Sequence, residues 1–315
     1  MDALTYDLKR IALGDGEGSY LTRNQRHRGL QQMAGDLRTL GFKLPAASSL
    51  KPRHVEALIS HWQASQLSTG TMKNRMGWLR WWAGRVRKAN VVPRDNESAG
   101  IENRTAFNGN RAHTTQADKM AALPYRIQLA LRLQMAFGMR LEESLKFRVS
   151  QADKGNGLAM QSSWCKGGRA REIPVTHPRQ RALLDELRQA CGDGSLIPQG
   201  QKYIDFRKEV EHVTWGAGIR NLHGHRHWYA QWRYQSLTGR PCPAAGGATY
   251  ERMSRAEKAA DFRARMQISS ELGHARLAIT DTYLGSRFAK AQNPRNEVAT
   301  HEARAGNPTH FARGL

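Results

Sequence analysis

Three histidines and an arginine lie close together in RNLHGHRHWYAQW, the stretch from Arg220 to Trp232. His223 and Arg226 are three positions apart, so a helix would place both on one face, where they can act on one ligand. A metal site formed by His223, His225 and His227 would need non-helical backbone, and no HExxH motif or carboxylate-rich partner stands nearby. The pattern therefore favours a histidine–arginine pair over a metal centre.

Three further phrases carry side chains suited to the same kind of chemistry. AFGMRLEESLKFR places Arg140 just after a glycine at a helix junction, with Glu143 one turn later. WCKGGRAREIPV places Lys166 at the tip of an expected hairpin, and ELGHARLAITDTYL places His274 nine residues before Tyr283. In chain order the set reads Arg, Lys, His-x-x-Arg, His, Tyr.

This ordered set resembles the active-site motifs of the tyrosine recombinase (phage integrase) superfamily. GMRLEES, CKGGRAREIPV, HGHRHWYA and LGHARLAITDTYL are similar to its catalytic-domain motifs, and LSTGTMKNRMGWLRWW is similar to the last long helix of its core-binding domain. The resemblance covers nearly the whole chain. It implies a site-specific recombinase that cuts and rejoins duplex DNA through a 3′-phosphotyrosyl intermediate, for a mobile element, with no metal, ATP or other cofactor.

The resemblance also implies a role for each matching residue. Arg140 and Arg226 would clamp the non-bridging phosphate oxygens, because guanidinium forks match phosphate, and His274 would donate a further hydrogen bond. A tyrosine hydroxyl has an ordinary pKa near 10 and is a poor nucleophile at neutral pH without a base. Tyr283 is therefore the expected nucleophile and His223 its base.

The leaving 5′-hydroxyl needs a proton, and the resemblance assigns Lys166 as the general acid. Arg169 and Arg171 compete with Lys166 for that role. Glu143 would orient Arg140 or a neighbouring histidine; the alternative is a carboxylate on the helix surface.

The chain departs from the family pattern in two places. His225 stands where the family usually has an apolar residue, and we expect His225 and His227 to serve packing or hydrogen bonding. The interval between Arg226 and His274 contains extra residues, GRPCPAAGGATYERMSRAEKAADFRARMQ, whose start predicts a loop and whose second part predicts a basic helix. The length of this interval leaves the particular recombination system open.

The elements that position these residues are expected to be mainly helical, with a small antiparallel β-sheet. Helical patterns cover Gln25 to Leu40, KPRHVEALISHWQ with Pro52 in its first turn, and STGTMKNRMGWLRWWAGRVRKAN with Ser68 as N-cap. They predict a helical bundle over residues 1–92, which resembles the family's SAM-like core-binding domain. Because this pattern starts near residue 20, we expect no additional arm-binding domain. The basic residues off the apolar stripe are candidates for phosphate contact: Lys73, Arg75, Arg80 and Arg87.

Residues 93–116 are rich in Asn, Gly, Arg and Thr without a sustained period, which predicts a linker. A mixed α/β catalytic domain is expected over 117–290 and a C-terminal tail over 291–315. Within the catalytic domain, strand-like runs flank a Lys-Gly-Gly turn, and helical patterns follow at PRQRALLDELRQAC and QKYIDFRKEVEHVTW.

Composition indicates a polyanionic partner. The chain has 315 residues, with 49 Lys and Arg against 27 Asp and Glu, a net charge of +22, and the basic residues are spread along its length. Such an excess favours double-stranded DNA as the partner. No apolar segment is long enough to anchor in a membrane, the three cysteines lack paired spacing, and the N-terminus does not resemble a signal peptide. We therefore expect a cytoplasmic protein, bacterial or phage-associated.

The resemblance implies a homotetramer on two DNA sites, with an accessory DNA-bending or directionality factor as a further candidate partner. Two other functions stay open. A type IB topoisomerase would use similar chemistry as a monomer, and an integrase-derived regulator would bind DNA without cutting it.

Overall fold

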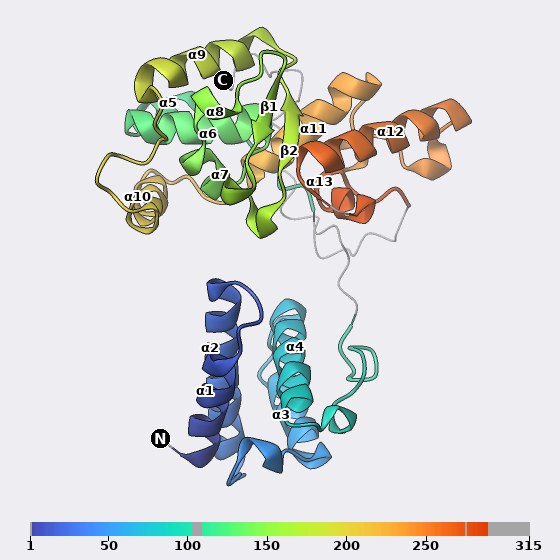
Figure 1. Ribbon diagram of the computed structural model, residues 1–315. Helices are drawn as coiled ribbons and strands as arrows, with labels where there is room; N and C mark the ends of the chain where they lie inside the picture. Colours follow the sequence, from blue (N-terminus) through green and yellow to red (C-terminus); the bar gives the residue numbers. More distant parts are fainter. Residues whose placement is uncertain (1, 103–108, 275, 289–315) are drawn as a thin grey trace. The chain divides into compact units, whose positions relative to one another are not determined.

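The computed structural model describes residues 2–102, 109–274 and 276–288. The chain forms two compact units, Met1–Thr105 and Ala106–Leu315, and each has its own hydrophobic core (Figure 1). Helices dominate the described chain, whose β-structure is one antiparallel pair of short strands. The predicted fold class, mainly helical with a small antiparallel sheet, is confirmed.

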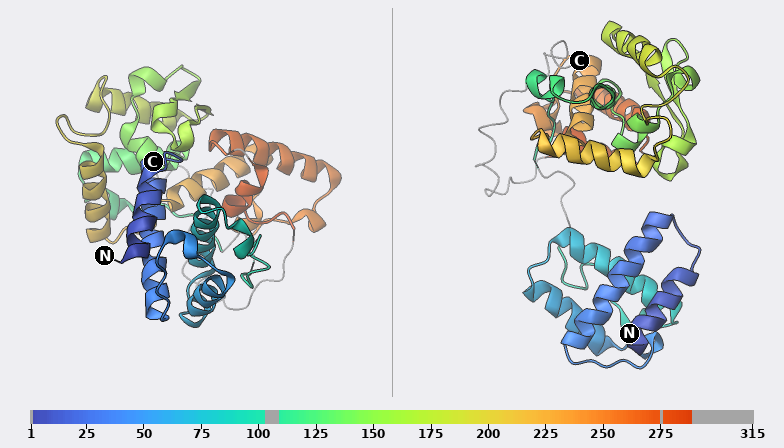
Figure 2. Two further views of the ribbon diagram at one scale, coloured as in Figure 1. Left: turned by 60° about the horizontal axis from the view of Figure 1, so that its bottom comes forward. Right: turned by 90° about the vertical axis from the view of Figure 1, so that its left-hand side faces the viewer.

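The N-terminal unit is a helical bundle made of α1 (Ala3–Gly14), α2 (Tyr20–Thr39), α3 (Pro52–Ala64) and α4 (Thr69–Arg85). The sequence pattern did not reveal α1, because charged residues interrupt its apolar positions. Leu4, Leu8 and Ala12 are nonetheless buried, and α1 packs along α2 (Figure 2). Helical structure therefore begins at Ala3 and not near residue 20.

The signals that start α3 and α4 act as predicted. Pro52 occupies the first turn of α3, and Ser68 Oγ accepts a hydrogen bond from Thr71 N at 3.2 Å at the start of α4. The apolar stripes of both helices are buried in the core. However, α4 ends at Arg85, and Arg87 has a positive φ of 58°. The expectation that Arg87 lies on this helix was wrong.

The interval 93–116 is packed at both of its described ends. Ala99 and Ile101 belong to the N-terminal core, and Thr115 is buried in the second unit. Residues 103–108 lie outside the described residues. The described ends of the predicted linker therefore pack on the cores of the two units.

The second unit places helices around one short hairpin. The core pairs α6 with α11, and most of α6 is buried. The described α-helices of the second unit are α5 (Ala117–Ala121), α6 (Tyr125–Phe137), α7 (Leu141–Lys146), α8 (Val149–Ala152), α9 (Pro178–Cys191), α10 (Tyr203–Gly216), α11 (Gly224–Thr238), α12 (Arg255–Glu271) and α13 (Asp281–Leu284). The helices predicted at PRQRALLDELRQAC and QKYIDFRKEVEHVTW are confirmed as α9 and α10.

The hairpin pairs β1 (Gly157–Met160) with β2 (Arg171–Pro174), in a register that sets Met160 opposite Arg171. It lies between α8, which β1 contacts, and α12, which β2 contacts (Figure 1). The predicted strand pair is confirmed. The connection between the strands contains two 3₁₀ turns, Ser162–Trp164 and Lys166–Gly168.

The extra residues between α11 and the end of α12 fold as predicted, into a loop followed by a basic helix. Ser254 caps α12, and Glu257 completes the capping box. No helix among the described residues has the length and apolar character needed to cross a membrane. The expected tail, 291–315, lies outside the described residues, as do the last two residues of the expected catalytic domain, 289 and 290.

Candidate active site

The predicted site residues come from separate segments that meet at one end of α11. Arg140 is the N-cap of α7, His223 precedes α11 and Arg226 lies in its first turn. His274 follows α12, and Tyr283 lies in α13. The structure brings these side chains together with Glu143. It leaves Lys166 outside the cluster.

Tyr283 is buried, with 4% of its surface exposed, and its hydroxyl has two polar neighbours. The oxygen lies 3.3 Å from His223 Nε2, and Arg226 Nε donates to it at 3.4 Å. The rings of His227 and His274 lie against the phenol, with centroids 4.5 and 5.4 Å away. The hydroxyl therefore has a candidate base and a cation within reach.

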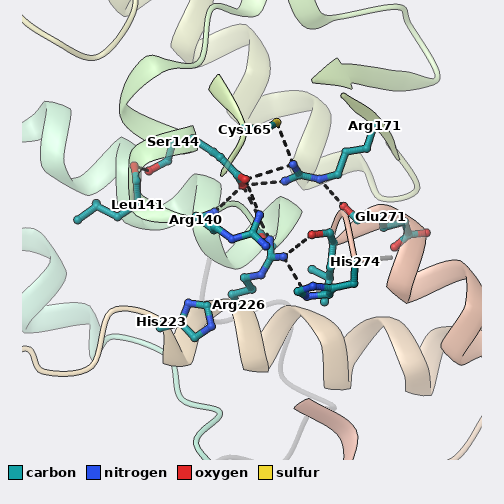
Figure 3. A network of polar contacts seen from close by, with 12 residues as sticks. Arg140, Leu141, Ser144, Cys165, Arg171, His223, Arg226, Glu271 and His274 are labelled. Atoms are coloured by element: carbon teal, nitrogen blue, oxygen red, sulfur yellow. Dashed lines mark hydrogen bonds and ion pairs between the residues drawn. The ribbon is translucent and has the colours of Figure 1, made fainter. Parts of the chain in front are cut away.

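Arg226 is fixed by backbone carbonyls. It donates to Gly138 O and to Leu272 O, and its Nη2 lies 3.3 Å from His274 Nε2 (Figure 3). Gly138 ends α6 with a φ of 61°, and a Cβ there would collide with the ring of Tyr229, so this turn requires glycine. Burial lowers the pKa of Arg226 to about 10, so the guanidinium stays charged at neutral pH.

Glu143 holds the arginines together. Its carboxylate accepts from Arg140 N at 2.8 Å, Arg140 Nη1 at 2.7 Å and Arg171 Nη2 at 2.7 Å, and it lies 3.8 Å from Arg226 Nη1. Burial alone would raise the pKa of Glu143, but the three arginines outweigh it and lower that pKa to about 2. Glu143 is therefore a buried, ionised carboxylate.

Two histidines of the cluster are neutral at pH 7. Desolvation by the surrounding protein, then the charges of Arg226 and Arg140, lower the pKa of His223 to about 4 and that of His274 to about 3. A neutral His223 can accept a proton from the Tyr283 hydroxyl. A neutral imidazole at His274 can still donate one N–H to an anion.

The other two histidines of the opening motif have different surroundings. His225 is completely buried, with Thr115 Oγ1 at 2.9 Å and Gln134 Oε1 at 3.2 Å from its ring nitrogens. His227 packs on the phenol of Tyr283. Across the described residues, no three His, Cys, Asp or Glu side chains are arranged to hold a metal ion.

The hairpin contributes Arg171 to the cluster, a residue that the sequence motifs offered only as an alternative to Lys166. Lys166 is exposed on the connection, and among the described residues it makes no hydrogen bond or ion pair to the cluster. Arg169 is exposed as well, whereas Arg171 is buried and bonded to Glu143. The alternation of β2 carried the signal for this, because Arg171 and Ile173 occupy the same buried face.

The four basic residues predicted to contact DNA phosphates from the N-terminal unit differ in their exposure and in the hydrogen bonds that they make within the protein. Arg75 donates to Asp36 Oδ2 at 3.0 Å, and Arg80 donates to Pro93 O at 2.9 Å and to the side chain of Asn96. These two guanidinium groups therefore help to hold the bundle together. Arg87 is exposed and Lys73 is half-buried. A phosphate contact by any of them stays a prediction.

Comparison with protein families matches residues 1–89 to the phage integrase N-terminal domain. No curated protein sequence matches the chain.

Several solved structures have a similar fold. A lambda integrase dimer bound to a COC′ core site matches with a TM-score of 0.58 and 13% identity, covering 91% of this chain and 79% of that one. The Tn1549 transposon integrase in complex with circular intermediate DNA matches at 0.57 and 13%, covering 95% and 99%. The XerH site-specific recombinase bound to difH matches at 0.54 and 17%, covering 94% and 84%. At these identities the likeness is one of fold.

Proposed function

Because this chain has the fold of the tyrosine recombinases and carries a phage integrase N-terminal domain over residues 1–89, we propose that it is a site-specific DNA recombinase. It cuts and rejoins duplex DNA through a 3′-phosphotyrosyl intermediate. The observation that carries the proposal is the Tyr283 hydroxyl, 3.3 Å from His223 Nε2 and 3.4 Å from Arg226 Nε, inside a cluster of arginines.

The proposed cleavage begins at the phenol. His223 takes the proton as the Tyr283 oxygen attacks phosphorus, and the bond from phosphorus to the 5′-oxygen breaks. Negative charge develops on the non-bridging oxygens, where Arg140, Arg226 and His274 stabilise it. Rejoining is the reverse, with a 5′-hydroxyl displacing the tyrosine, so the energy of the phosphodiester bond is kept and ATP is not needed.

The two arginines of the clamp are not equivalent. Arg226 is buried and held by two carbonyls, whereas the Arg140 side chain is 24% exposed. We assign Arg140 as the group that first meets the phosphate and Arg226 as a fixed charge beneath it. Their excess over the single carboxylate of Glu143 leaves the site cationic, which favours an anionic transition state.

Lys166 is proposed as the general acid for the 5′-oxygen. It lies on an exposed connection, so its side chain is free to approach a bound strand. Lysine suits this role because its ammonium is a mobile proton donor.

The proposed substrate is double-stranded DNA, and the proposed assembly is a tetramer on two sites. Among the structural neighbours, lambda integrase is bound to a core site as a dimer and to a Holliday junction as a tetramer. The Tn1549 integrase belongs to a transposon, and service to a mobile element is part of the proposal for this chain.

The test is covalent trapping on a library of nicked duplexes with a randomised central segment, in which loss of a short fragment prevents rejoining. The wild-type chain should form a protein–DNA adduct resistant to denaturant. Tyr283→Phe should form none while its DNA affinity stays nearly unchanged, because the phenol oxygen makes the bond and contributes little to binding.

Tyr125→Phe is the matched control, since Tyr125 is an exposed tyrosine of the same unit. It should trap as well as wild type. Absence of any wild-type adduct would favour the DNA-binding regulator, and an adduct with Tyr283→Phe would place the nucleophile elsewhere.

A further inference from the structure

Arg171 is the most connected buried cation near the proposed site. From β2, its Nη2 donates to Glu143 Oε2 at 2.7 Å and its Nη1 to Glu143 Oε1 at 3.2 Å. Nη1 also lies 3.1 Å from Cys165 Sγ, and Nε donates to Glu271 O at 2.7 Å (Figure 3). All three guanidinium nitrogens are thus occupied by protein atoms.

These bonds join three segments of the site. Glu143 lies on α7 with Arg140, and β2 follows the connection that carries Lys166. Glu271 is the last residue of α12, and the next carbonyl, at Leu272, accepts from Arg226. Arg171 therefore contacts the supports of both clamp arginines.

The turn after α12 is built closely around this side chain. Gly273 has a φ of 68°, and a Cβ there would lie 3.0 Å from Arg171 Cδ. This turn leads directly to His274, whose backbone N donates to Ser269 O at 2.9 Å. A glycine is needed here both for the left-handed backbone and for the space that Arg171 takes.

We propose that Arg171 is a positioning residue of the cleavage reaction, which orients Glu143 and through it Arg140, and which fixes the turn that carries His274. This inference rests on the proposed recombinase function. Arg171 does not touch the DNA phosphate, because its side chain is 4% exposed and its donors are used. It acts through the groups that do.

Only an arginine satisfies this arrangement. A planar fork can meet both oxygens of one carboxylate while its Nε reaches a carbonyl, whereas a lysine ammonium is a single point charge. The charged groups facing Glu143 are Arg140 from α7, Arg226 from α11 and Arg171 from β2. Without Arg171, the carboxylate keeps the bonds from Arg140 but loses the partner that sets its orientation.

The first experiment measures single-turnover adduct formation and DNA affinity for Arg171→Met and Arg171→Lys. The probe is the nicked duplex that the wild-type chain selects from the randomised library. Arg171→Met should slow adduct formation roughly 100-fold, the scale of a misplaced catalytic group, with little change in affinity. Arg171→Lys should recover part of the rate, because it restores the charge without the fork.

Arg132→Met is the matched control. Arg132 also makes a paired contact with one carboxylate, that of Glu186, at 2.7 Å from both nitrogens, between α6 and α9. Its loss should lower the melting temperature without slowing adduct formation. A slow rate in this control would mean that loss of any such ion pair impairs the reaction, and would overturn the positioning role.

The second experiment tests whether Arg171 acts through Glu143. In a Glu143→Gln background, Arg171→Met should add little further loss of rate, since the group that it orients is already changed. Additive losses would overturn the inference. The double variant removes both charges of the Arg171–Glu143 ion pair, so it can be compared with Glu143→Gln even if Arg171→Met alone does not fold.

A pH profile separates positioning from general destabilisation. Arg171→Met removes a charge that lowers the pKa of Glu143, so as acid is added its rate should begin to fall at a higher pH than the wild-type rate does. Unchanged rate and profile in Arg171→Met, beside an active wild type, would contradict this inference alone. An inactive wild type would remove the proposed function, and the inference with it.

Discussion

At the candidate site, one buried carboxylate contacts three guanidinium groups, while the histidines beside them stay neutral. Removing histidines from water has a consequence for stability. His225 is the clearest case, because both of its ring nitrogens face protein atoms and its pKa is lowered, chiefly by burial, from 6.5 to about 3. As the pH falls, His225 therefore becomes protonated near pH 6.5 in the unfolded chain but only near pH 3 in the folded chain.

Between pH 6.5 and about 3 the unfolded state binds more protons at this position, so the free energy of unfolding rises with pH across that window and falls as acid is added. One such histidine contributes about 1.4 kcal/mol per pH unit. We predict that His225→Asn lowers stability at pH 7.5, where hydrogen bonds are lost, and flattens the pH dependence below 6.5 by about that slope. Urea unfolding from pH 7.5 to 5 measures both.

His212→Gln is the control, because His212 is exposed on α10 of the same unit. It should leave the slope as in wild type. An unchanged slope in His225→Asn would mean that the buried imidazole does not resist protonation.

At the scale of single residues, the sequence motifs predicted most of the side chains that gather around Tyr283 but not Arg171. The residues at motif positions, such as Tyr283, could be placed because each one matches a family phrase. Arg171 could be considered only as an alternative to Lys166, because its main contact is with a partner 28 positions away in sequence, Glu143. The alternation of β2 indicates that Arg171 is buried, but local spacing does not identify the carboxylate that it contacts.

At the scale of the elements, helix α12, from the extra interval between Arg226 and His274, supports the turn that carries Tyr283. Arg265 of α12 is fully buried and donates to Asp261 at 3.0 Å and to Asp281 Oδ1 at 2.9 Å. It also donates to Gly285 O at 3.2 Å. Asp281 begins α13 and Gly285 follows it, so one guanidinium holds both ends of the turn that carries Tyr283.

We predict that Arg265→Met lowers the free energy of unfolding by about 3–5 kcal/mol, the cost of leaving the buried carboxylate of Asp261 without its ion-pair partner. It should also slow adduct formation more than it weakens DNA binding, because Tyr283 loses its support. Arg265→Lys serves as the milder variant. Phe262→Ala, at an exposed position of the same helix, should change neither quantity. Equal rates in Arg265→Met and wild type would show that α13 holds its place without this contact.

Local signals predicted elements well where the chain marks its own boundaries. Pro52 and Ser68 start helices for reasons confined to a few residues, and the strand pair around the Lys-Gly-Gly turn followed from composition. The failures have a physical cause too. The buried face of α1 holds few large apolar residues, and α4 stops early because Arg87 adopts a left-handed backbone, which periodicity does not reveal.

For the whole molecule, the motif resemblance is confirmed at the level of fold by the comparisons, and the net charge of +22 suits a DNA partner. Fold and charge do not separate a recombinase from a topoisomerase. The number of DNA strands that each reaction breaks does separate these two activities. In the proposed recombination, exchange between two duplexes would break every strand once and each break would occupy one Tyr283, so that reaction would require as many chains as strands.

We therefore predict a dimer on one DNA site and a tetramer when two sites meet, as symmetric assemblies of one chain. Mass measurement of the complexes on the selected duplex tests this. A topoisomerase breaks one strand of one duplex at a time, so a monomer suffices, and it relaxes supercoiled plasmid that lacks any special site. The recombinase should leave such plasmid supercoiled. One chain per duplex together with relaxed plasmid would assign the same tyrosine chemistry to a topoisomerase, and the tetramer would have to be abandoned.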